Sequence, residues 1–285
     1  MLNAPLRQVD FERVRRLIQC ERLIRLARNP SNVSSVKEAC QRAGLKAGDS
    51  AIDVGCGPLG ALPALAEMVG PAGTVFGVDR NQDVLMIGRR ALDQQGLDNV
   101  QLLRADINEL DLTEAGLQGK FDVAYCRLFL INQRDPVATL RRIAGLVRPG
   151  GHIIAHELLD DPSYPSFDPP VPAFGRFLGL VHETMRRQGR SPDVARRFRA
   201  ITQEAGLEEI GQLGIINANP ADAAEFIQEK GLGMLLVFKQ TFAQLRLCSR
   251  TESDDLTREL NAAMLREYRT FLSWIVVELI ARVPA

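Results

Sequence analysis

The feature that most constrains this chain is a glycine-rich turn that follows directly on an apolar segment. Ser50–Val54 has the composition of a buried strand and runs into Gly55-Cys56-Gly57-Pro58-Leu59-Gly60. Glycine lets the backbone turn tightly and approach a ligand closely. Because proline suits the first turn of a helix, we expect a helix to begin near Pro58. The pattern predicts a cofactor site at the carboxyl end of a parallel strand.

The alternation of strands and helices continues after this turn. The expected strands cover 50–54, 74–79, 100–105, 121–128, 152–159 and 207–216, with a closing strand over 271–283. The expected helices cover 10–28, 34–43, 84–94 and 135–147. Alternation at this rhythm implies βαβ units and a parallel sheet with helices packed on it.

The rhythm breaks after residue 160. Residues 161–172 carry five prolines and predict an extended loop, and helices are expected over 174–188, 192–205, 220–247 and 254–270. We therefore expect an N-terminal helical lid over 1–48 and an α/β domain over 49–285. Helical insertions at about 161–206 and 218–270 would lie at the edge of the sheet where ligands bind.

The charge balance and the cysteines indicate in which cellular compartment the protein works and which binding partners it lacks. Lys plus Arg and Asp plus Glu number 35 each, so no global positive field attracts nucleic acid or an anionic membrane. The five cysteines are scattered without a Cys-x-x-Cys pair, which suits reduced thiols. Acidic residues near the N-terminus argue against a transit peptide, and apolar stretches fall short of a bilayer span. We predict a cytoplasmic protein; a homodimer is compatible with the sequence.

Three carboxylates near the turn bear on the choice of cofactor. Asp79 ends the second strand, where a carboxylate can accept hydrogen bonds from both ribose hydroxyls. Asp53 lies inside the first strand and needs a partner such as an amino-acid ammonium. Asp106 ends the third strand, where it could meet an adenine amine. Three acids and a proline at the expected helix start disfavour the pyrophosphate of NAD.

Four motifs then carry a family resemblance over about residues 45–160. They are Ile52-Asp53-Val54-Gly55-Cys56-Gly57-Pro58-Leu59-Gly60, Gly77-Val78-Asp79-Arg80, Ala105-Asp106-Ile107 and Val147-Arg148-Pro149-Gly150-Gly151. In this order they resemble the class I S-adenosylmethionine-dependent methyltransferases. The resemblance implies a Rossmann-like α/β fold, with a seven-stranded, mostly parallel sheet, an antiparallel last strand and helical cap insertions.

The same resemblance assigns roles to residues around the cofactor. It implies that Gly55 and Gly57 approach the methionyl part of S-adenosylmethionine and that Asp79 holds the ribose. Arg80 and Ile107 would flank the adenine, and Asp106 would bind its amine. Cys126 lies where a backbone carbonyl often meets the methionyl amine in this family.

Candidates for catalysis are fewer. His156 ends the fifth strand near the expected acceptor, and His182 lies on the first inserted helix; either could act as a general base, or be purely structural. His152 and His156 are about 13 Å apart on a strand, so no histidine metal site is expected. An arginine run could clamp an acidic acceptor or be a solvated helix face; its members are Arg186, Arg187, Arg190, Arg196, Arg197 and Arg199.

The function that we predict is methyl transfer to a small, largely apolar metabolite in a lidded pocket. The acceptor atom is left open among oxygen, nitrogen and carbon. Two other classes of function compete with this interpretation. One is a NAD-dependent oxidoreductase. The other is a member of the same fold that binds S-adenosylmethionine without transferring methyl, such as a cyclase.

Overall fold

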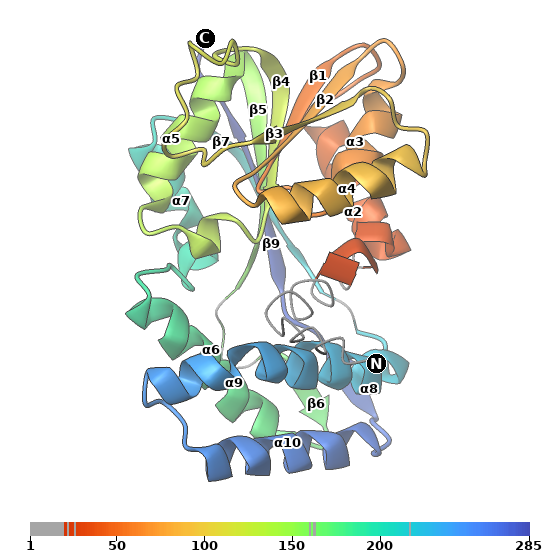
Figure 1. Cartoon of the computed structure of the whole chain (residues 1–285), viewed down its shortest axis with the longest axis vertical. Coiled ribbons are helices and arrows are strands. Elements are labelled where there is room, and N and C mark those ends of the chain that lie inside the picture. The colour runs from red at the N-terminus through yellow and green to blue at the C-terminus, as the bar shows by residue number, and fades with distance from the viewer. Residues whose placement is uncertain (1–19, 22, 26, 160, 162–163, 217) are drawn as a thin grey trace, which may run out of the picture. The chain divides into compact units, whose positions relative to one another are not determined.

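The computed structural model describes residues 20–285, apart from 22, 26, 160, 162–163 and 217, and divides the chain into two units, Met1–Glu109 and Leu110–Ala285 (Figure 1). Each unit is described by itself. Residues 1–19 of the predicted N-terminal lid over 1–48, together with 22 and 26, lie outside the described residues, so the lid remains a prediction. Within the described residues, no helix combines the length and the apolar character needed to cross a membrane.

The first unit contains a parallel set of three strands with their helices. Its elements are α2 (Pro30–Arg42), β1 (Ser50–Val54), α3 (Leu62–Val69), β2 (Thr74–Asp79), α4 (Gln82–Asp93) and β3 (Val100–Arg104). β2 pairs in parallel with both β1 and β3. Two asparagines set helix starts, because the Asn29 side chain caps α2 and the Asn81 side chain caps α4.

The second unit begins with two parallel strands and their connecting helix. These elements are β4 (Phe121–Arg127), the short 3-10 helix η1 (Leu130–Asn132), α5 (Pro136–Leu146) and β5 (Val147–Leu158). β4 pairs in parallel with β5. Asp135 caps α5 by accepting a hydrogen bond from the backbone N–H of Ala138, and Pro136 occupies the first turn.

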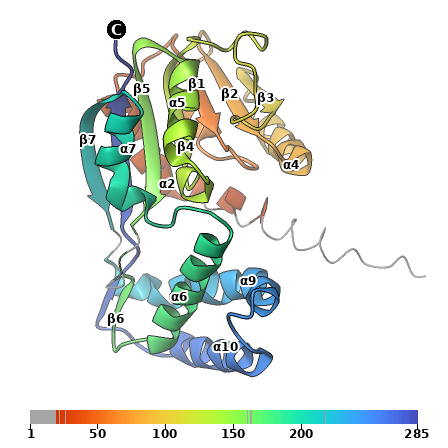
Figure 2. The same cartoon turned by 90° about the vertical axis from the view of Figure 1, so that its left-hand side faces the viewer.

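The rest of the second unit carries the inserted helices and four further strands. Its elements are β6 (Ser166–Asp168), α6 (Pro172–Arg187), η2 (Val194–Arg197), α7 (Phe198–Glu204), β7 (Glu208–Ile215), η3 (Pro220–Asp222), α8 (Ala223–Phe226), the π-helix η4 (Ile227–Leu232), α9 (Gly233–Gln244), α10 (Arg250–Met264), β8 (Thr270–Leu272) and β9 (Val276–Arg282). Figure 2 shows α6, α9 and α10 gathered beside β6, beyond the ends of the long strands of this unit.

The seven long strands follow the order β3-β2-β1-β4-β5-β9-β7. β9 pairs antiparallel with both β5 and β7, and the other six strands are parallel to one another. The predicted Rossmann-like sheet, with its last strand antiparallel, is confirmed.

Four expectations about elements need correction. The helix expected near Pro58 begins at Leu62. The proline-rich loop contains β6, and the closing strand expected over 271–283 is two strands. β8 pairs with β6, whereas β9 joins the large sheet. The helix expected over 220–247 is divided by η4, whose hydrogen bonds follow a π-helical pattern.

Candidate functional site

The glycine-rich turn adopts a conformation that only glycine takes without strain. Gly55 and Gly57 have φ angles of 75° and 57°, in the left-handed region. The backbone N–H groups of Gly55 and Cys56 both donate to the carbonyl of Val78, at 2.7 and 3.1 Å, which ties the turn to β2. A Cβ atom at Gly57 would meet no atom of the described residues within 4 Å. The space in front of this residue is therefore open to a ligand.

Asp53 holds the end of the glycine-rich turn by a hydrogen bond. Its side chain is 2% exposed, and Oδ2 accepts a hydrogen bond from the backbone N–H of Ala61 at 2.7 Å. A Cβ atom at Gly60 would lie only 2.2 Å from that oxygen. The buried carboxylate therefore has a partner within the chain, and it fixes the residues that lead into α3. Its expected contact with a ligand ammonium remains a prediction.

Asp79 joins the turn to the end of β2. Oδ2 accepts a hydrogen bond from the N–H of Gly57 at 3.1 Å, and Oδ1 accepts one from the N–H of Asn81 at 2.9 Å. The side chain is only partly buried. A carboxylate held by two N–H groups at the end of a parallel strand can still accept hydrogen bonds from vicinal hydroxyls.

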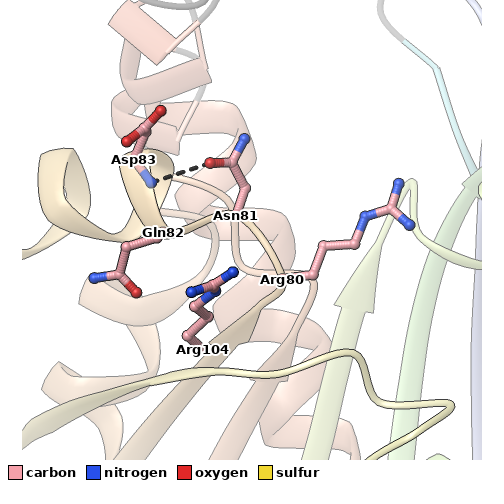
Figure 3. A pocket seen from close by; sticks show the side chains of 5 residues that line it. All are labelled: Arg80, Asn81, Gln82, Asp83 and Arg104. Carbon is pink, nitrogen blue, oxygen red and sulfur yellow. Dashed lines mark hydrogen bonds between the residues drawn. The ribbon is translucent and has the colours of Figure 1, made fainter.

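The residues after β2 and β3 form one side of this region. Arg80 Nη1 lies 3.8 Å from Asp106 Oδ2, and Ile107 is buried. An open depression of about 470 Å³ lies beside them (Figure 3). It is lined by Arg80, Asn81, Gln82, Asp83 and Arg104.

The chemistry of this set fits an adenosyl cofactor better than a phosphate-bearing one. Asp53, Asp79 and Asp106 bring carboxylates to the ends of three neighbouring strands, which repel phosphate and suit hydroxyl, amine and ammonium groups. Cys56 adds no nucleophile, because burial, followed by the charges of Asp53 and Asp79, raises the pKa of its thiol.

His156, in the second unit, lies in a buried polar network. Its Nδ1 is 3.0 Å from the hydroxyl of Tyr125, and its Nε2 is 3.0 Å from Glu278 Oε2. The three side chains are each at most 2% exposed. The rings of Tyr125 and His156 meet edge to face, 5.3 Å apart. Both ring nitrogens are therefore engaged inside the sheet.

Glu157, the next residue, was not singled out from the sequence. Its Oε1 accepts hydrogen bonds from the N–H groups of Phe129 and Leu130 at 2.9 and 2.6 Å, at the start of η1. Oε2 has no hydrogen-bond partner among the described residues. Complete burial raises the pKa of this carboxyl to about 8, against the lowering effect of the backbone N–H groups and Arg127. The sequence signal that could have identified Glu157 is a charged residue inside an otherwise largely apolar strand.

Glu157 helps to hold a strained segment. Leu128, between β4 and η1, has a φ angle of 49° although it is not glycine. Its N–H donates to the carbonyl of His156 at 2.9 Å, and its carbonyl accepts a hydrogen bond from the Asn132 side chain at 2.7 Å. Strained backbone of this kind clusters at functional sites.

The remaining predicted residues have different surroundings. Cys126 is fully buried at the end of β4, and His182 is half-buried on α6. The arginine run is largely paired, because Arg187 contacts Glu183, Arg196 contacts Asp161 and Arg197 contacts Asp193. This favours the solvated-face interpretation over a clamp.

Across the described part of the chain, no group of three or more His, Cys, Asp or Glu side chains is arranged to hold a metal ion.

Comparisons with known proteins show which proteins this chain resembles. Residues 45–165 match the family described as a methyltransferase domain. A demethylmenaquinone methyltransferase from Halalkalibacterium halodurans is 32% identical over 190 residues, which cover 61% of this chain and 74% of that protein. A ubiquinone biosynthesis O-methyltransferase from Acinetobacter baumannii is 33% identical over 44% of this chain and 49% of its own length.

Solved structures extend the likeness to the fold. A phosphoethanolamine N-methyltransferase from Haemonchus contortus, solved with phosphomonomethylethanolamine and S-adenosylhomocysteine, superposes with a TM-score of 0.53. The superposition covers 88% of this chain and 53% of that chain, at 15% identity. At that identity the likeness concerns the fold alone.

Proposed function

Because this chain belongs to the class I S-adenosylmethionine-dependent methyltransferases, we propose that it methylates a small, largely apolar metabolite. The observation that carries the acceptor class is the apolar content of the inserted helices. Helix α6 alone buries Phe174, Phe177, Val181 and Met185. The names of the two relatives above refer to quinones, which are apolar ring compounds, and this supports the same class of acceptor.

The cofactor residues take the following proposed roles. Asp79 accepts hydrogen bonds from the ribose hydroxyls, and Asp106 accepts one from the adenine amine. Arg80 and Ile107 flank the adenine. Gly55, Gly57 and the backbone of Cys126 approach the methionyl part, and Asp53 supports them through Ala61. S-adenosylmethionine supplies a methyl group that its sulfonium already activates.

The chain has mainly to align the acceptor with that methyl group and to exclude water. Alignment of this kind is worth about 7–11 kcal/mol of the barrier in well-oriented reactions. The acceptor attacks the methyl carbon as the carbon–sulfur bond breaks, and S-adenosylhomocysteine leaves. Any proton on the acceptor atom passes to a base or to water.

Two histidines are proposed as candidates for that base. His182 is half-buried on an inserted helix, and the two ring nitrogens of His156 lie 3.0 Å from Tyr125 and Glu278. Catalytic hydrogen bonds can tighten only in the loaded enzyme, so both positions are tested. His182→Ala and His156→Ala are assayed across pH with the true acceptor, and cofactor affinity is measured separately. If both variants keep the turnover and the pH profile of the wild type, neither histidine is the base, and the reaction depends on positioning of the acceptor alone.

The decisive experiment is transfer of a labelled methyl group. The full chain is incubated with methyl-labelled S-adenosylmethionine and a metabolite extract, and in parallel with a demethylated quinol. We expect a labelled, organic-soluble product that Asp79→Ala reduces strongly. Cofactor binding without any labelled product would favour the rival in which the fold binds S-adenosylmethionine but transfers no methyl. Tighter binding of NADH, followed by its fluorescence, would favour the oxidoreductase.

A further inference from the structure

Trp274 is the single tryptophan of the chain and lies in the connection between β8 and β9. The carbonyl of the next residue, Ile275, accepts a hydrogen bond from the N–H of Leu159, directly after β5. Val276 then pairs with Leu158, the last residue of β5. Trp274 therefore lies beside the carboxyl end of β5. Ligands of parallel α/β sheets bind at this end of the strands.

The indole of Trp274 carries a donor with no acceptor. Its Nε1 atom is buried and has no hydrogen-bond partner among the described residues. An indole N–H can only donate, and a buried tryptophan usually finds an acceptor for it. Leaving a donor of this kind unpaired forfeits its hydration without replacement. The residue as a whole is half-buried.

Trp274 belongs to a cluster of aromatic side chains, which we call the aromatic cluster. Its members are Phe167, Phe174, Phe177, Phe226, Tyr268, Phe271 and Trp274. The ring of Trp274 meets Phe226 edge to face at 5.1 Å and Phe174 at 6.1 Å. Phe226 and Tyr268 are half-buried like Trp274, whereas the other four are buried. The cluster thus combines four buried residues with three half-buried ones.

The backbone around the cluster is irregular where it meets these rings. Phe226 ends α8, and the π-helix η4 begins at the next residue. A side chain at Gly231, in η4, would come within 3.2 Å of the Phe174 ring, so glycine permits this close approach. Single π-helical turns occur frequently at functional sites.

We propose that Trp274 is a specificity-determining residue of the methyl acceptor site, donating its indole N–H to an oxygen of a flat, apolar ring that packs against Phe226. The inference rests on the proposed function and names the acceptor more closely. Aromatic side chains bind flat rings by edge-to-face and offset contacts. A neutral carbonyl, ether or phenolic oxygen supplies the acceptor that the buried N–H lacks.

Two matched probes test this assignment. One is 2,3-dimethyl-1,4-naphthoquinone, and the other is 2,3-dimethylnaphthalene, which has the same ring without the oxygens. Affinities are measured by equilibrium dialysis with the full chain and saturating S-adenosylhomocysteine. Trp274→Phe keeps an aromatic ring and removes the N–H together with the rest of the five-membered ring of the indole. Both probes lose the same ring contact, so we expect it to weaken quinone binding by about threefold to tenfold more than hydrocarbon binding, the range of one hydrogen bond.

Further variants separate recognition from folding. Phe226→Leu should weaken both probes, because it removes ring contact, and Phe238→Leu, outside the aromatic cluster, should weaken neither. Because Trp274 is the only tryptophan, bound quinone should quench the tryptophan fluorescence of the wild-type chain in step with dialysis, whether or not Trp274→Phe folds. Circular dichroism checks the fold of each variant.

Three results would overturn the assignment: equal weakening of both probes by Trp274→Phe, no weakening of either, or quinone binding absent or without quenching. The proposed function fails by a different observation. If calorimetry finds no binding of S-adenosylmethionine to the wild-type chain, methyl transfer is excluded, even where the probes still report on Trp274.

Discussion

His156 Nε2 and Glu278 Oε2 lie 3.0 Å apart inside the sheet, although the two residues are 122 positions apart in the chain. His156 belongs to β5, and Glu278 is its register partner on β9. The hydroxyl of Tyr125, on β4, adds a third member to the network. Three adjacent strands are thus joined by side chains as well as by backbone hydrogen bonds.

The first prediction concerns the energy of this pair. Removing one partner of a buried pair leaves the other uncompensated, so His156→Ala and Glu278→Ala should each lower the free energy of unfolding by about 3 kcal/mol. The double variant should lose about 1–3 kcal/mol less than the sum of the single losses. Urea unfolding measures all three. The exposed pair Arg176 and Glu259 serves as a control, with a coupling below about 1 kcal/mol. Additive losses at His156 and Glu278 would refute the coupling.

The second prediction is a pH dependence caused by Glu157. Its pKa is about 8 in the folded chain and near 4.5 when unfolded, so between these values the folded state alone keeps the proton. The contribution of protonated Glu157 to the free energy of unfolding is fully present below about pH 4.5 and is lost as pH rises through 8. Glu157→Gln cannot ionise. The stability of the wild type relative to this variant should therefore fall by a few kcal/mol between pH 4.5 and 8.

Urea unfolding at several pH values checks the slope. Glu114→Gln, at an exposed position in the same unit, is the matched control and should track the wild type. Parallel curves for the wild type and Glu157→Gln would show that Glu157 is ionised in the folded chain.

The third prediction concerns cofactor affinity. Asp79→Ala removes the proposed acceptor of the ribose hydroxyls and also the hydrogen bond to Gly57 that orders the turn. Calorimetry should show binding of S-adenosylmethionine weakened by about 1.5–3 kcal/mol. Asp98→Ala, at an exposed position in the same unit, should leave it unchanged. If Asp79→Ala binds S-adenosylmethionine as tightly as the wild type, Asp79 does not accept the hydrogen bonds of the ribose hydroxyls.

The fourth prediction separates steric conflict from backbone strain. Gly60 and Gly96 both have positive φ angles, of 49° and 65°. The Cβ of Gly96→Ala meets no atom of the described residues within 4 Å, so this variant should cost only the backbone strain, about 1–2 kcal/mol of stability. Gly60→Ala would place its Cβ 2.2 Å from Asp53 Oδ2, so it should cost distinctly more and weaken cofactor binding. Similar unfolding free energies for the two variants would show that the turn can shift without cost.

The fifth prediction concerns metals. We expect methyl transfer to survive exhaustive dialysis against EDTA, because alignment and the sulfonium carry the reaction in the proposed mechanism. Activity is measured before and after dialysis and again after magnesium is added. Activity that disappears with EDTA and returns with magnesium would reveal a metal requirement.

Much of the fold could be predicted from local sequence. The strands β1, β2, β3 and β4 match their expected ranges within one or two residues, because each is a short apolar run with turn residues on both sides. The start of α3 could not be predicted in the same way. Pro58 suits a helix start by itself, but the contact of Asp53 with Ala61 delays the helix to Leu62.

The parts that sequence could not predict depend on distant contacts. Nothing local to Ser166–Asp168 indicates a strand, because β6 forms by pairing with β8, about a hundred residues later. His156 was expected to face an acceptor, and its neighbours Tyr125 and Glu278 come from two other strands. A glutamate inside the largely apolar segment Val276–Arg282 is a signal that such a partner exists, without naming it.

The position of β9 also has a consequence for biosynthesis. A ribosome delivers β5 and β7 well before β9, and β9 lies between them in the finished sheet. Until residues 276–282 emerge, neither strand has its final neighbour on that side. The nascent chain therefore exposes open strand edges, which attract other chains. Insertion of β9 therefore closes two exposed edges at once, and it can happen only after nearly the whole chain has been made.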